Sequence, residues 1–89
     1  IELAGLTGTV PPDAVRALEA HPTAILPPRL GITMNNLALA IESSDTRLAE
    51  RLYRLAIRGQ RQTPQDPEYA SALHNYSSLL LGTGRAAAA

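Results

Sequence analysis

Five arginines lie at short, regular intervals in one stretch of the sequence and can make charged contacts. Their spacing of four, three, four and three residues places them in a single stripe along a predicted helix. A guanidinium donates paired hydrogen bonds to a carboxylate or a phosphate, so the stripe can contact an acidic partner or a nucleic-acid backbone. The alternative is a face that meets only water, because Glu50 lies within helical reach of Arg47 and Arg54. The arginine stripe consists of Arg47, Arg51, Arg54, Arg58 and Arg61.

The sequence lacks the residue combinations that catalysis and metal binding require. It contains no cysteine, and neither His21 nor His74 has a companion at a spacing typical of metal ligands. It also has no glycine-rich phosphate loop, no paired carboxylates and no combination of nucleophile, base and acid. We therefore expect no enzymatic activity, no cofactor and no small-molecule substrate.

The composition is that of one small domain. The chain has 89 residues, of which 45% are apolar, and its formal net charge is zero. A chain of this size buries only about 60–65% of its unfolded surface, so its stability is expected to be marginal without a neighbour. No apolar run approaches the roughly 20 residues that a membrane-spanning helix needs. We expect a soluble intracellular protein, in the cytoplasm or an organelle interior.

One segment of the chain has a similar copy later in the sequence. Residues 28–41 recur as residues 67–80, thirty-nine positions later, with a proline at the start of each copy and Asn36 matched by Asn75. Apolar character is kept at positions 30/69, 34/73, 37/76, 40/79 and 41/80. Repetition at this period indicates a solenoid, in which each unit buries its apolar face against its neighbours and the assembly presents a binding surface.

Proline, capping and glycine signals divide the sequence into four helices. Prolines suit a first helical turn, Asp45 can cap a helix that begins at Thr46, and Gly59 is interpreted as the breaker that ends that helix. No period typical of strands extends over more than a few residues. The predicted fold is all-α. Its helices run from Pro12 to about Ala20, from Pro28 to about Glu42, from Thr46 to about Arg58 and from Pro67 to about Gly82.

Apolar residues at helical spacing predict which sides of these helices are buried. Three tyrosines lie on the apolar rows, and we expect them in the core with their hydroxyls reaching its edge: Tyr53, Tyr69 and Tyr76. The rows of the second, third and fourth helices are Leu30, Met34, Leu37 and Ile41; Leu48, Leu52 and Leu55, beside Ala49, Tyr53 and Ala56; and Tyr69, Leu73, Tyr76 and Leu80.

The repeated segment carries short motifs at regular places. These are Met34-Asn35-Asn36-Leu37-Ala38, Ala49-Glu50-Arg51-Leu52-Tyr53-Arg54-Leu55-Ala56, Asp66-Pro67 and Leu73-His74-Asn75-Tyr76. The pattern resembles tetratricopeptide repeats, most closely the longer variety found in kinesin light chains and their bacterial relatives. The resemblance covers about two thirds of the chain. It implies a helix-turn-helix α-solenoid fragment, with one complete repeat and the first helix of the next.

The resemblance also implies where a partner binds. In this family the first helix of each pair lines a concave groove, and asparagines at the positions of Asn36 and Asn75 bind the backbone of an extended peptide. An amide suits this role because it donates and accepts hydrogen bonds at once. The groove residues are then Asn35, Asn36, His74 and Asn75, unless the asparagines satisfy neighbouring turns or face water. A clamp for a terminal carboxylate is not expected, because Ile32 and Ser71 replace its basic residues.

Three parts and three functions follow from these observations. Residues 1–27 form an N-terminal segment with one short helix, interpreted as the remnant of a preceding repeat. Residues 28–85 form the repeat and a half, and residues 86–89 are either a helix start or unassigned sequence written as alanine. The first hypothesis is a scaffold or protein-interaction module within a larger complex. The alternative is a structural subunit docked in a multiprotein assembly, and the third choice is an RNA-binding helical repeat.

Overall fold

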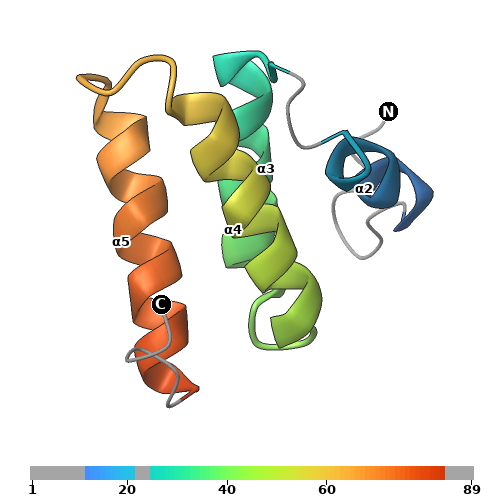
Figure 1. The fold of residues 1–89 in the computed structure, drawn as a ribbon. Coiled ribbons are helices and arrows are strands. Elements are labelled where there is room, and N and C mark those ends of the chain that lie inside the picture. The colour runs from blue at the N-terminus through green and yellow to red at the C-terminus, as the bar shows by residue number, and fades with distance from the viewer. Residues whose placement is uncertain (1–11, 22–24, 84–89) are drawn as a thin grey trace.

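The computed structural model describes residues 12–21 and 25–83, and within this part of the chain four α-helices and no strand occur (Figure 1). The predicted all-α fold is confirmed, and each helix ends within two residues of its predicted end. The tail 86–89 and the beginning of the segment 1–27 lie outside the described residues. The helices are α2 (Pro12–Glu19), α3 (Pro28–Ile41), α4 (Thr46–Gln60) and α5 (Pro67–Gly82).

The starts of the three long helices are set by the predicted signals. Prolines occupy the first turn of α3 and of α5, where a missing N–H removes no intrahelical bond. The Asp45 carboxylate accepts a hydrogen bond from the backbone N–H of Leu48 at 3.1 Å and caps α4. Asp66 caps α5 by accepting from the N–H of Glu68 at 2.9 Å.

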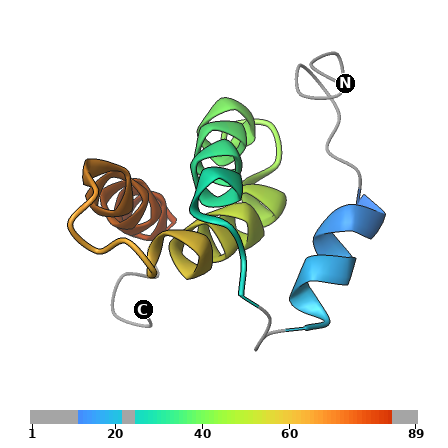
Figure 2. The same ribbon diagram turned by 90° about the horizontal axis from the view of Figure 1, so that it is seen from above.

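The helices pack around α4. A turn at residues 42–45 joins α3 and α4 into an antiparallel hairpin, and α5 returns to lie against α4 and the edge of α3 (Figures 1 and 2). On the opposite side, α2 contacts α4 and touches neither α3 nor α5. The helix α4 thus packs on both α3 and α5, whereas α2 packs on α4 alone among the described helices.

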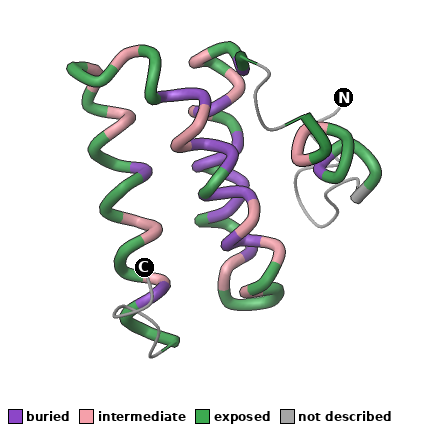
Figure 3. Tube along the Cα trace, in the orientation of Figure 1, coloured by how far each residue is buried: buried purple, intermediate pink, exposed green. Residues whose placement is uncertain are grey.

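The core is concentrated between α3 and α4, where most buried residues lie (Figure 3). Tyr53 is fully buried there, while Tyr69 and Tyr76 are half-buried, as their places on the apolar rows predict. Leu73 departs from its row, because 39% of it is exposed on α5. Buried side chains of α3 and α4 include Met34, Leu37, Ala38, Ile41, Ala49, Leu52, Leu55 and Ala56.

Two glycines set the closest approach of α3 and α4. A Cβ atom on Gly31 would lie 2.8 Å from the carbonyl oxygen of Ala56, and one on Gly59 would lie 3.2 Å from the Cα of Gly31. The prediction that Gly59 ends the helix was wrong, because α4 continues through Gly59 and Gln60. The Gln60 side chain is fully buried, and its amide donates to the carbonyl of Pro28 at 2.6 Å. Close packing rather than helix termination therefore accounts for this glycine.

Candidate functional site

Two of the predicted groove residues meet inside the molecule. Asn75 Nδ2 donates to Asn35 Oδ1 at 3.1 Å, and Asn35 Nδ2 donates to Ser71 Oγ at 3.5 Å. Asn35 is only 3% exposed, and Asn75 is half-buried. Because a buried amide must find hydrogen-bond partners, the bond to Asn75 satisfies Asn35, and this pair joins α3 to α5.

Asn36 lies on a different side of α3 and is exposed. It lines a hollow of about 330 Å³, and those residues of the described part of the chain that line this hollow lie on one face of α3. The amide of Asn36 and the hydroxyl of Thr33 are its polar groups, and the side chains of Leu37 and Ala40 are apolar. We call this surface the α3 hollow; its residues are Thr33, Asn36, Leu37 and Ala40.

His74 is exposed on α5 and lies at the repeat position of Asn35. Asn36, in turn, lies at the repeat position of Asn75. The hydrogen bond between Asn35 and Asn75 therefore joins the first copy of the repeat to the second. Asn36, the counterpart of Asn75, lies on α3, and His74, the counterpart of Asn35, lies on α5. Of the four predicted groove residues, these two face solvent.

Two members of the arginine stripe contact α2. Arg51 binds both carboxylate oxygens of Glu19, through Nε at 2.9 Å and Nη2 at 2.7 Å. Arg58 Nη2 donates to the carbonyl of Leu18 at 3.1 Å. Hydrogen bonding from Arg51 lowers the pKa of the Glu19 carboxyl below its ordinary value. The N-terminal helix is thus fixed to α4 by charged contacts as well as by the buried side chain of Val15.

Among the described residues, the other three arginines of the stripe do not contact α2 in the same way. Arg54 donates from Nη2 to the buried carboxylate of Glu50 and from Nε to the hydroxyl oxygen of Tyr76 at 3.0 Å. Arg47 and Arg61 are exposed. The arginine stripe is therefore divided between internal contacts and solvent.

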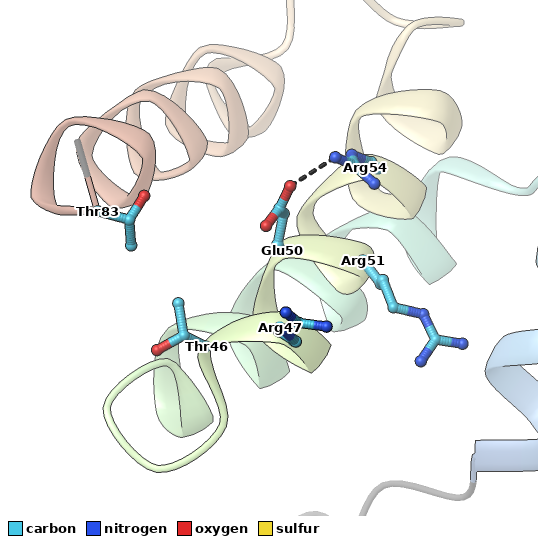
Figure 4. A pocket seen from close by; sticks show the side chains of 6 residues that line it. All are labelled: Thr46, Arg47, Glu50, Arg51, Arg54 and Thr83. Atoms are coloured by element: carbon cyan, nitrogen blue, oxygen red, sulfur yellow. Dashed lines mark hydrogen bonds and ion pairs between the residues drawn. The ribbon is translucent and has the colours of Figure 1, made fainter. Parts of the chain in front are cut away.

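A second hollow, of about 700 Å³, lies between α4 and the end of α5 (Figure 4). Glu50 and Arg54 pair within it, Thr83 faces them from α5, and Arg51 extends away toward α2. The carboxylates of Glu19 and Glu50 pair with Arg51 and Arg54 and so offset part of the positive charge of this hollow. The lining residues are Thr46, Arg47, Glu50, Arg51, Arg54 and Thr83.

Several residues of these surfaces were absent from the predicted set. Thr33, Leu37 and Ala40 could have been found, because Thr33 and Ala40 lie three before and four after Asn36 on a helix, and Leu37 lies four after Thr33. Glu19 and Tyr76 could not have been found, because they contact the arginine stripe from other helices. No short-range sequence pattern indicates such contacts.

Over residues 12–21 and 25–83 the structure holds no group of three histidine, aspartate or glutamate side chains placed to bind a metal ion. No helix in this part of the chain has the length and apolar character to cross a membrane. No protein-family model, curated protein or solved structure matches this chain.

Proposed function

We propose that this chain is a non-enzymatic, tetratricopeptide-like interaction module that binds a partner protein. The α3 hollow carries the proposal, because it combines an exposed side-chain amide with an apolar floor. Such a surface gains affinity from the apolar contacts and specificity from the amide. Its volume of about 330 Å³ suits a few side chains of a partner.

The hydrogen bond between Asn35 and Asn75 leaves fewer of the predicted groove residues for a partner. Asn35 and Asn75 bind each other, whereas Asn36 is exposed, which favours Asn36 as the asparagine that contacts a partner. The contact surface therefore centres on α3, and we assign partner binding to Asn36 with Leu37 and Ala40.

Peptides selected by display against the full chain test this function. Asn36→Ala should weaken the binding of a selected peptide about two- to twelvefold, since one hydrogen bond contributes about 0.5–1.5 kcal/mol. Ser78→Ala, on the exposed side of α5 and outside the predicted groove, is the matched control and should leave the affinity unchanged. Affinity should vary little between about 0.05 and 0.5 M salt. If no peptide is selected, or if selected peptides bind independently of Asn36, the proposal fails.

A docked structural subunit is the second candidate, and one observation favours it. On α5, Leu73 and Leu81 are 39% and 68% exposed, although large apolar side chains are usually covered in a stable assembly. A far-UV circular dichroism melt of the isolated chain distinguishes the two candidates. A cooperative helical transition supports an independent module, and a weakly helical chain that melts without cooperativity supports a subunit completed by its neighbours.

A further inference from the structure

The α3 hollow has a counterpart in the second copy of the repeat. Each of its four residues is matched by a residue thirty-nine positions later on α5. The matching residues of α5, in the same order, are Ala72, Asn75, Tyr76 and Leu79.

On α5 these counterparts face the rest of the molecule. Ala72 is fully buried, and Leu79 packs against the core cluster. The ring of Tyr76 lies 6.3 Å from that of Tyr53 on α4, measured between centroids, and its hydroxyl accepts a hydrogen bond from Arg54. The α5 face that corresponds to the α3 hollow is therefore the one that packs against α4, with Asn75 reaching α3.

On α3 no helix of the described residues covers the corresponding face. Thr33, Asn36 and Ala40 are exposed, and α2, the described helix that precedes α3, packs against α4 and not against α3 (Figure 2). Leu37 and Ala40 are also smaller than their counterparts Tyr76 and Leu79, which leaves room for a bulky side chain above them.

From this correspondence we infer that the α3 hollow binds an amphipathic α-helix of a partner protein, seated as α4 is seated on α5. A large apolar or aromatic side chain of the partner lies over Leu37 and Ala40, in the manner of Tyr53 beside Tyr76. A polar side chain next to it pairs with the Asn36 amide. The inference rests on the proposed function and specifies the class of partner.

Two other occupants fit the structure less well. An extended peptide needs several amides along its backbone, whereas Asn35 and Asn75 are already paired and leave Asn36 alone. A second copy of this chain would have to offer the same kind of helix, but its α4 is enclosed by α3, α5 and α2. A helix from a different protein satisfies both conditions.

A synthetic peptide of residues 45–61, which contains the α4 sequence, is the probe. The full chain should bind it in isothermal titration calorimetry, and amide chemical shifts should change along the outer face of α3. Ala40→Glu should weaken binding at least tenfold, because it places an unpaired charge on the apolar floor. The control Leu73→Glu, on the exposed side of α5, should keep the affinity within about twofold.

Two altered probes test how the helix binds. A peptide with Tyr53→Ala should lose at least tenfold in affinity, because it lacks the anchor. A peptide with Leu52→Pro cannot form the helix and should not bind. Both substitutions Ala40→Glu and Leu73→Glu fall on exposed residues, and circular dichroism of each variant verifies that the fold is kept.

Four outcomes would overturn the inference. These are no binding at about 1 mM probe, equal binding of the proline peptide, loss of binding with Leu73→Glu but not with Ala40→Glu, and self-association of the chain that Ala40→Glu prevents. If the helix probe fails while display-selected peptides bind through Asn36, the proposed function stands and the helical partner is wrong. If neither kind of ligand binds, both proposals fail.

Discussion

Asn75 Nδ2 lies 3.1 Å from Asn35 Oδ1, so that two side-chain amides form a polar joint between α5 and α3. Asn35 also donates to Ser71, one turn before Asn75 on α5. Burying an amide costs free energy unless the amide is hydrogen-bonded. The two helices must therefore dock at the position along their axes at which the two amides meet. The joint fixes the register of one copy of the repeat on the other.

Loss of this joint should destabilise the docking of α5. We expect Asn35→Ala to lower the free energy of unfolding by about 1–2 kcal/mol, since it removes a buried hydrogen bond. Urea denaturation of Asn35→Ala, Asn75→Ala and the double variant should give a coupling energy of about 0.5–1.5 kcal/mol. Asn36→Ala, on the exposed neighbour, should change stability by less than about 0.5 kcal/mol. A coupling energy near zero would show that the joint contributes nothing.

The glycine contact between α3 and α4 gives a second prediction. Gly31→Ala should destabilise the protein by about 1–3 kcal/mol, because the new Cβ would lie 2.8 Å from a backbone oxygen that cannot move away freely. Gly82→Ala is the matched control, since nothing among the described residues beyond its own helix lies within 4 Å of its added Cβ, and it should change stability by less than about 0.5 kcal/mol. Thermal melts of both variants measure the difference, and equal melting temperatures would contradict the close approach.

We expect the hydroxyl group of Tyr53, the buried tyrosine of α4, to contribute to the stability of the fold. Burial and the hydrogen bond to Glu42 raise the pKa of the Tyr53 phenol, so the hydroxyl stays protonated and donates to Glu42 Oε1 at 2.9 Å. Tyr53→Phe should cost about 1–2 kcal/mol, because the bond joins a neutral donor to a charged acceptor. Glu42→Gln retains an acceptor and should cost less in the same urea titration. The reverse order would exclude this bond as the cause.

Acid should release α2 from α4. Arg51 lowers the pKa of Glu19, so their contact contributes stability above the ordinary glutamate value of 4.5 and loses it as the pH falls through the lowered pKa. Amide chemical shifts of α2, followed from about pH 6 to pH 3, should therefore change only below 4.5. Glu19→Gln should show weaker docking at neutral pH and lack this transition. Unchanged α2 shifts in the wild-type chain would contradict the prediction.

The helices were predictable because their signals are local. The prolines at residues 28 and 67 and the cap at Asp45 act within one turn of the helix that each begins. The continuation of α4 through Gly59 was not predictable in this way, because it depends on Gly31, which the chain brings near only by folding. A glycine that permits close packing and one that ends a helix are identical in sequence.

The candidate site was predictable only in part, for the same reason. The repeat drew attention to the positions of Asn36 and Asn75 together, yet one is exposed and the other is paired with Asn35. The difference arises because this side of α5 packs against α4, whereas no helix between residues 12 and 83 that the structure describes packs on the same side of α3. Equivalent positions in a repeat share a backbone but not always an environment.

The short turn at residues 42–45 has a consequence for how the chain folds. It joins the two helices that hold most of the core, so their contacts are close in sequence and their closure costs little conformational entropy. We expect the α3–α4 hairpin to form the folding nucleus, with α5 and α2 adding to it afterwards. Substitutions inside the hairpin will then slow folding, whereas those in the outer helices will mainly accelerate unfolding.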